Sequence, residues 1–283
     1  MAIHPLAVVH PTARLGHDVE VGPYAVIEAD VVVGDRCVLG GYAMLKQGTT
    51  LGADCKVFER ATIGGLPQHV RMSRDAGQLV IGCGNTIREN VTIHRALHPS
   101  GTTRIGDNNL IMVGAHVAHD CTIGNHAIFA NNALLAGHVT IEDRAFISGA
   151  VAIHQFCRVG TLAMVGGLAR ITKDVPPFVT IDGGSDYVVG LNTIGLRRAG
   201  LSADDILELK NAYRTIYRSG LKWADVLEHL HATYTTGPAA HFAPFLAESK
   251  RGIIAERRLP PGAAVKMGVE AITDLPTLQA KAG

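Results

Sequence analysis

The chain has 283 residues, of which 47% are apolar and only 5% aromatic, and its formal net charge is +1. This near-neutral balance excludes bulk electrostatic attraction to nucleic acid or to an anionic membrane surface. No apolar run approaches the roughly 18 residues that a membrane span needs, and a regular repeat begins at the amino terminus, so we expect neither a membrane segment nor a signal peptide.

Large aliphatic or aromatic side chains recur at every sixth position from residue 3 to residue 171. In this series of 29 positions, Ile, Val, Leu or Phe is missing only at His69, Asp75 and Pro99. A period of six fits neither an α-helix nor a flat strand, whose apolar positions recur at three and four or at two. It predicts short strands with a corner every six residues, which is the hexapeptide pattern of a parallel β-helix.

Two further residue types mark the predicted coils. Glycine often follows the large residue, and we expect it to supply corner backbone angles that other residues resist. Cys37, Cys55, Cys121 and Cys157 occupy a small, inward position of the repeat, whereas Cys83 lies alone and no CxxC motif is present. We therefore expect buried free thiols, which suit a reducing, cytoplasmic location.

The repeat is interrupted twice without a change of phase, which predicts loops ejected from the coils near 69–80 and 96–104. Loops on a rigid scaffold often carry binding residues. The first interruption contains or adjoins Gln68, His69 and Arg71, so we expect a substrate-binding loop, with a plain solvated loop as the alternative.

The repeat fades after residue 175, and we expect the β-helix to occupy 1–190. The segment 202–205 (Ser-Ala-Asp-Asp) has the features of a capped helix start, and Ser219-Gly220 of its end. Two more helices are predicted over 223–232 and 239–251, completing a helical domain over 191–256. We expect 257–283 to be a loosely ordered tail, or to wrap the helices.

Stacking of the coils predicts a polar cluster at one corner. If three hexads form one coil, residues 18 apart lie about 4.8 Å apart in a column. His119 then stacks with Gly137 and Gln155. Asp120 stacks with His138 and Phe156, and His154 lies beside them.

Five longer motifs, at 88–95, 116–120, 131–138, 153–156 and 195–198, closely resemble the UDP-N-acetylglucosamine 3-O-acyltransferases of lipid A synthesis. The resemblance covers about residues 3–254. It implies a left-handed parallel β-helix followed by a helical domain, and a homotrimer with active sites between subunits. It also implies two substrates, an acylated acyl carrier protein and a UDP-sugar, and no cofactor or metal.

Acyl transfer to a sugar hydroxyl requires a base, and histidine is suited to this because its unperturbed pKa is near neutrality. The resemblance makes His119 the base, oriented by Asp120, and makes the backbone N–H of Gly137 the donor to the oxyanion. The resemblance further implies a set of substrate-binding residues, which are Gln68, His69, Arg71, His116, His138, His154, Gln155, Asn192 and Arg198.

One loop departs from the family pattern. The family usually has Gln-Asp-x-Lys where this chain has Gln68-His69-Val70-Arg71. An acceptor-only carboxylate has become an imidazole, so a different UDP-sugar, such as a 3-amino analogue, is an alternative substrate.

Two other properties are implied by the resemblance. Gly167 occupies the place of the residue that limits the acyl pocket, so we expect a long acyl chain. Arg170, Lys173, Arg214 and Arg218 could receive the acidic carrier protein, or they could form a solvated basic face.

Two readings from other classes remain open. His116, His119 and His138 could hold zinc in a trimeric enzyme of the γ-type carbonic anhydrase kind. Alternatively, the chain could be an inactive structural solenoid.

Overall fold

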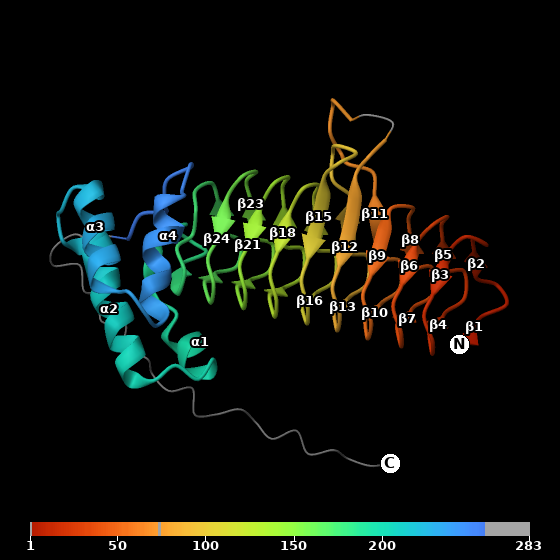
Figure 1. Cartoon of the computed structure of the whole chain (residues 1–283), viewed down its shortest axis with the longest axis horizontal. Coiled ribbons are helices and arrows are strands. Elements are labelled where there is room, and N and C mark those ends of the chain that lie inside the picture. Colours follow the sequence, from red (N-terminus) through yellow and green to blue (C-terminus); the bar gives the residue numbers. More distant parts are fainter. Residues whose placement is uncertain (1, 73–74, 258–283) are drawn as a thin grey trace, which may run out of the picture.

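The strands of this computed structural model, which describes residues 2–72 and 75–257, wind into a three-sided prism (Figure 1). The chain passes from one sheet to the next at each corner, and neighbouring strands are parallel except for β27 and β28 at the end of the first sheet, which pair antiparallel. The helices lie together at one end of the prism. The predicted tail lies, beyond Arg257, outside the described residues.

Each side of the prism is one sheet. The first sheet contains β1 (Ala2–Ile3), β4 (Glu20–Val21), β7 (Val38–Leu39), β10 (Lys56–Val57), β13 (Thr86–Ile87), β16 (Leu110–Ile111), β19 (Ile128–Phe129), β22 (Phe146–Ile147), β25 (Met164–Val165), β27 (Val179–Ile181) and β28 (Val188–Leu191). The second contains β2 (Val8–Val9), β5 (Val26–Ile27), β8 (Met44–Leu45), β11 (Thr62–Gly65), β14 (Thr92–His94), β17 (His116–Val117), β20 (Leu134–Leu135), β23 (Ala152–Ile153) and β26 (Arg170–Ile171). The third contains β3 (Arg14–Leu15), β6 (Val32–Val33), β9 (Thr49–Leu51), β12 (Gln78–Ile81), β15 (Thr102–Ile105), β18 (Thr122–Ile123), β21 (Thr140–Ile141) and β24 (Arg158–Val159).

The pairing register confirms a coil of three hexads. His116 pairs with Leu134, which is 18 residues further on. At the two interruptions the partner of Lys56 is Thr86, 30 residues away, and the partner of Thr86 is Leu110, 24 residues away. Both loops therefore add multiples of six residues. The large side chains consequently stay inside the prism on either side of each loop.

Most of the glycines that follow the large residues serve close packing and not corner angles, so that expectation was wrong for them, whereas Gly64 has a φ of 85°. A Cβ on Gly34 would lie 2.5 Å from the backbone nitrogen of Ala53, so the next coil leaves no room for a side chain. The left-handed φ angles at the corners belong mostly to other residue types, including Asp18 (56°) and Arg36 (54°). Glycine is thus selected here for its missing Cβ.

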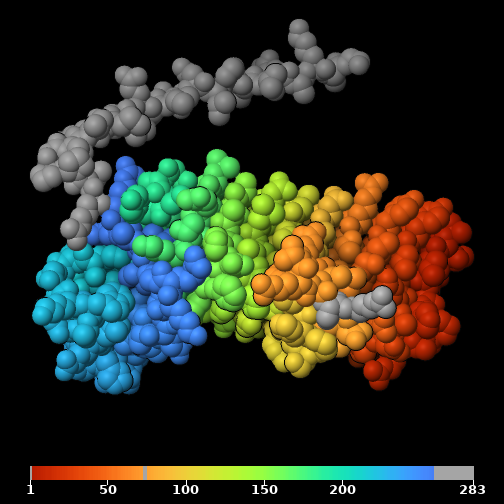
Figure 2. All heavy atoms as spheres, turned by 90° about the horizontal axis from the view of Figure 1, so that it is seen from above, coloured from red at the N-terminus to blue at the C-terminus, as the bar shows by residue number. Residues whose placement is uncertain are grey.

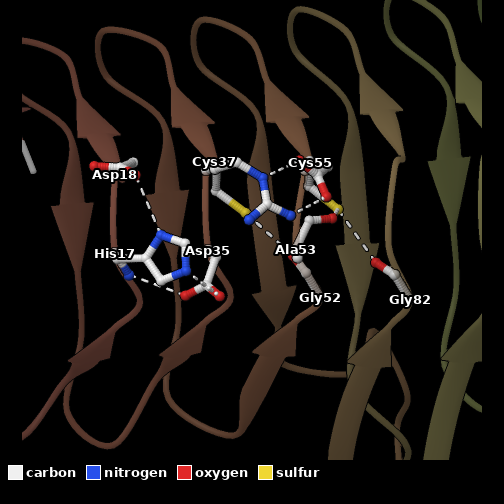
Figure 3. Close-up of polar contacts among 10 residues, drawn as sticks. His17, Asp18, Asp35, Cys37, Gly52, Ala53, Cys55 and Gly82 are labelled. Carbon is white, nitrogen blue, oxygen red and sulfur yellow. Dashed lines mark hydrogen bonds and ion pairs between the residues drawn. The ribbon is translucent and has the colours of Figure 1, made fainter.

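Side chains tie one coil to the next at the corners between the third and first sheets (Figure 3). The backbone N–H of His17 donates to Asp35 Oδ1 at 2.9 Å, and Arg36 Nε donates to Asp54 Oδ1 at 2.7 Å. The Asp35 carboxylate thereby satisfies a corner N–H that the strands leave unpaired.

Four of the cysteines are buried free thiols, as predicted, whereas Cys83 is exposed. Each of the four buried thiols donates to a backbone carbonyl in the coil stack, and two of these contacts are drawn in Figure 3. The distances are 3.1 Å from Cys37 Sγ to Gly52 O and 3.2 Å from Cys55 Sγ to Gly82 O.

The helical part contains α1 (Thr193–Arg198), α2 (Ala203–Arg218), α3 (Trp223–Thr233), the 3-10 helix η1 (Pro238–His241) and α4 (Phe242–Ala247). Ser202 caps α2 through a capping box with Asp205, as the sequence predicts. The helix predicted over 239–251 is wrong at both ends, because a 3-10 turn precedes it and the chain leaves it to pair with Asp174. Gly252 O accepts the Asp174 N–H, and Ile254 N–H donates to Asp174 O, at 2.9 Å each. None of the described helices is long and apolar enough to cross a bilayer.

An ion pair joins the helices to the prism. His241 Nε2 lies 2.7 Å from Glu142 Oε2, and Arg158 Nη1 donates to Phe245 O at 3.0 Å. The hydrogen bond to Glu142 raises the pKa of His241 above its ordinary value near 6.5. The folded state therefore holds this proton more tightly than the unfolded chain does.

We expect His241→Ala to lower the melting temperature more at pH 6 than at pH 9. The raised pKa contributes stability that is complete below pH 6.5 and is lost as the pH rises through the folded-state value. His241 is partly exposed, so solvent screening limits the contribution to about 1 kcal/mol or less. Thermal unfolding of the wild type and the variant across this pH range measures the effect. The same difference in melting temperature at pH 6 and at pH 9 would contradict the prediction.

Candidate active site

The predicted polar cluster lies at the corner between the second and third sheets. His119 lies between β17 and β18, and His138 occupies the matching turn one coil further on. The His138 N–H donates to His119 O at 3.0 Å, and the Phe156 N–H donates to Gly137 O at 3.2 Å. The column predicted from the 18-residue spacing is therefore present in the structure.

His119 and Asp120 form a hydrogen-bonded pair. His119 is 7% exposed, and its Nδ1–H donates to Asp120 Oδ2 at 2.8 Å. The same carboxylate oxygen accepts the Leu97 N–H at 3.0 Å, and the Asp120 N–H donates to Thr103 Oγ1 at 2.8 Å. Because Nδ1 carries the proton, Nε2 of the neutral ring is the nitrogen that can accept one.

Gly137 lies against the ring of His119. A Cβ on Gly137 would lie 2.6 Å from His119 Cε1 and 2.8 Å from its Nε2, so no larger residue fits without moving the ring. Among the described residues, none accepts a hydrogen bond from the Gly137 N–H. The corner thus places a free backbone donor beside a basic nitrogen.

His138 closes one side of this corner. Its ring stacks on Phe156 at 4.6 Å and meets His119 at 5.2 Å, nearly perpendicular. Burial lowers the pKa of His138, which the negative charge of Asp120 partly opposes. His138 is therefore held in its neutral form near pH 7.

The first ejected loop folds back over the same corner, and both loops project from the prism beside β12 and β15 (Figure 1). The ring of His69 lies 5.5 Å from that of His119 at 82°. Gln68 and Arg71 are exposed, as are His154 and Gln155 on the other side of the corner. Figure 2, which looks down onto this side of the prism, shows the orange atoms of the first loop region at the surface beside the yellow atoms of the following coils.

A second pair of imidazoles lies behind the corner, and sequence reasoning missed one of them. His116 Nδ1 lies 2.7 Å from Thr92 Oγ1, and the ring of His94 meets that of His116 at 4.9 Å. His94 is 7% exposed and packs over Gly65, where a Cβ would lie 2.8 Å from its ring. Position 94 directly follows a buried repeat position, and this was the signal that could have identified it.

The remaining predicted residues lie elsewhere in the chain. Asn192 caps α1 by accepting the Gly195 N–H at 3.0 Å, and with Arg198 it lines a groove of about 750 Å³ over the first sheet. Gly167 lies on the corner between the first and second sheets. A single chain therefore does not bring these three residues to the corner of His119.

The zinc site that the sequence left open as an alternative, formed by His116, His119 and His138, is not formed by these three residues. Within the described part of the chain, the set of three possible ligand atoms within 4.8 Å of one another comes from His119, Asp120 and His138. His116 is not a member of this set. The three imidazoles that would resemble a catalytic zinc site are therefore not gathered.

Comparison with known proteins decides the family. The chain is 49% identical to the acyl-[acyl-carrier-protein]–UDP-N-acetylglucosamine O-acyltransferase of Halorhodospira halophila over 258 residues, covering 89% of this chain and 98% of the relative. It is 46% identical to the enzyme of the same name from a Janthinobacterium species, with the same coverage. The chain belongs to this family of acyltransferases.

Family models and solved structures agree. The second domain of UDP-N-acetylglucosamine O-acyltransferase matches residues 174–254, and the bacterial transferase hexapeptide matches 12–47 and 102–137. The Francisella novicida acyltransferase superposes with a TM-score of 0.87 at 35% identity, covering 90% of this chain and 95% of that one. The Bacteroides fragilis enzyme gives 0.85 at 40% identity, covering 89% and 99%.

We expect His94 to make the protein acid-sensitive. Burial, aided by His116 and His119, lowers the pKa of His94 to about 4, whereas the unfolded value is near 6.5. Between these values only the unfolded chain binds the proton, so stability falls as the pH falls, by up to about 3 kcal/mol.

Chemical denaturation of the wild type and His94→Gln at pH 7 and pH 4.5 measures this effect. The stability difference between the two proteins should shrink, or shift in favour of the variant, at the lower pH. A difference that does not change with pH would show that His94 does not titrate as described.

Proposed function

We propose that this chain transfers a 3-hydroxyacyl group from acyl carrier protein to the 3-hydroxyl of UDP-N-acetylglucosamine, the first step of lipid A biosynthesis. The proposal rests on the His119–Asp120 pair beside the free N–H of Gly137. It is supported by the family's enzymes, whose names specify these two substrates.

In the proposed reaction, His119 Nε2 removes the proton of the sugar hydroxyl as its oxygen attacks the thioester carbonyl. Asp120 holds the ring in the required tautomer and stabilises the imidazolium that forms. The carbon–sulfur bond then breaks, and the departing carrier-protein thiolate takes the proton from His119. The reaction needs no cofactor, because proton transfer and carbonyl attack are complete within these groups.

The carbonyl oxygen becomes negatively charged during the attack, and the Gly137 N–H is the proposed donor to it. A backbone donor is fixed before the substrate arrives, so it costs no reorganisation when the charge develops. His116, His138, His154 and Gln155 are proposed to hold the sugar and the acyl hydroxyl around this point.

We propose that the active form is a homotrimer in which each site uses two chains. Arg198 lies over the first sheet, whereas His119 lies at the corner of the other two. Outward-facing Ile128, Phe146 and Met164 line the groove beside Arg198 and would be covered by a neighbour. In a closed ring of three subunits, the surface that carries Arg198 on one chain meets the corner that carries His119 on the next chain, and this contact occurs three times.

Subunit mixing tests the mechanism and the assembly together. His119→Ala should lower acyl transfer by about 10²–10⁴-fold, because it removes the general base. Arg198→Ala should weaken nucleotide binding, since arginine pairs well with phosphate. Co-expression of the two variants in equal amounts should restore about a quarter of the wild-type activity. With random mixing, one site in four combines an intact His119 from one chain with an intact Arg198 from its neighbour.

His10→Ala provides the control, because His10 is an exposed histidine on the same corner, far from the cluster, and this variant should keep full activity. Activity no higher in the mixture than in the separate variants would show that His119 and Arg198 do not meet between chains.

Gly167 offers a test of acyl-chain selection. Its added Cβ would lie 3.4 Å from Gly149 O, an ordinary contact, so a side chain fits without moving the backbone. If the acyl chain ends here, Gly167→Met should shift preference from long to short chains by about ten-fold or more, because each excluded methylene is worth about 0.8 kcal/mol. Competition between carrier-protein thioesters of different lengths measures the shift. The same preference in both proteins would place the chain end elsewhere.

The acyl donor is proposed to dock on exposed basic residues near the helices. Arg218 is already paired with Glu256, whereas the sequence-predicted residues Arg170, Lys173 and Arg214 are exposed. The buried unpaired thiols fit a reducing, cytoplasmic location for this reaction.

A further inference from the structure

The backbone of Asp120 is held by a bond that the next coil does not use. In that coil the N–H at the same corner position belongs to His138, and it donates to the backbone carbonyl of His119 at 3.0 Å. The coil before Asp120 carries the second ejected loop, and here the N–H donates at 2.8 Å to the side-chain Oγ1 of Thr103. A side chain thus does at Asp120 what a backbone carbonyl does one coil further on.

Thr103 is fully buried, with an exposed fraction of 0%. It occupies the inward position of β15 that Cys121 takes in the following coil, where an apolar side chain would be expected. A buried hydroxyl without a hydrogen bond is costly, and the Asp120 N–H offsets this cost. The bond also restrains Asp120, whose φ of 58° lies in the left-handed region that is unfavourable for residues with a side chain.

The second ejected loop holds the carboxylate from its other side. The Leu97 N–H donates to Oδ2 at 3.0 Å, and a Cβ on Gly101 would lie 3.1 Å from Oδ1, so the loop backbone lies close to both oxygens. The loop is tied in turn to the end of the first loop, because the Gly77 N–H donates to Ala96 O at 2.8 Å. Thr103 lies directly after this loop, where the chain re-enters the third sheet, and it therefore anchors the returning end of the support.

We propose that Thr103 is a positioning residue, which acts through the backbone of Asp120 to place the carboxylate that orients His119. The inference rests on the proposed function, in which His119 accepts the proton of the sugar hydroxyl. Asp120 Oδ2 lies 2.8 Å from His119 Nδ1, so moving the carboxylate away by about 1 Å would break this hydrogen bond. A misplacement of that size, about 1 Å, can cost about 10²-fold in rate.

Thr103→Val keeps the shape of the side chain and removes its acceptor. We expect kcat to fall by about 10- to 100-fold with KM for both substrates nearly unchanged, because the variant leaves the proposed substrate-binding side chains in place. Thr103→Ser keeps the hydroxyl and should retain most of the activity.

Thr49→Val provides the matched control and should keep full activity. Thr49 and Thr103 lie in the same column of the third sheet, since both pair with Leu79, and Thr49 is 1% exposed. Thr49 Oγ1 has no hydrogen-bond partner among the described residues, so this variant removes a buried hydroxyl without affecting Asp120.

Proton NMR separates positioning from a general loss of folded protein. An imidazole N–H bonded to a carboxylate gives a resonance far downfield, and Asp120→Asn identifies the signal of His119 by its loss. The signal should be present in the wild type and in Thr103→Ser, and weakened or lost in Thr103→Val.

Three results would overturn the role of Thr103. These are an unchanged kcat in Thr103→Val, an equal loss in Thr49→Val, and a lower kcat in Thr103→Val with the resonance unchanged. Absence of transfer by the wild type would overturn the proposed function, whereas the resonance, which needs no substrate, would still show whether Thr103 places the pair.

Discussion

The structure depends on one constraint, the return of the chain to the same point after three hexads. Parallel strands stacked in this register bury the same face of every coil, so thin aliphatic ladders such as Val117 over Leu135 fill the interior. Each coil contacts only its neighbours, so the prism is a sum of similar local interactions. The same register converts an 18-residue spacing in sequence into contact in space.

Loops can be added to such a prism only if the register survives them. Here the interruptions lengthen the coil by multiples of six, and two buried asparagines strengthen the region. Asn109 donates to Asn85 Oδ1 at 3.0 Å and accepts the Ala127 N–H at 2.7 Å, while Asn85 donates to Gly106 O at 2.9 Å. The rigid frame lets one loop hold Asp120 through the Leu97 N–H and the other bring His69 to His119.

Period and register could be predicted from the sequence because they depend on the order of large and small residues alone. The His119–Gly137 column followed from that count. The packing role of the glycines could not be predicted from that count, because the clash that excludes a Cβ at Gly34 comes from the next coil. His94 was missed because its burial depends on Gly65, which reaches it only through the irregular pairing of β11 with β14. The early end of the last helix likewise depends on pairing with Asp174, a contact distant in sequence.

The central claim is that one corner of the coil stack performs the chemistry. A crystal structure with UDP-N-acetylglucosamine and an unreactive analogue of the acyl thioester tests it most directly. The account predicts the sugar 3-hydroxyl within about 3 Å of His119 Nε2 and the carbonyl oxygen at a similar distance from the Gly137 N–H. Substrates bound with the hydroxyl and the carbonyl away from these two groups would contradict it.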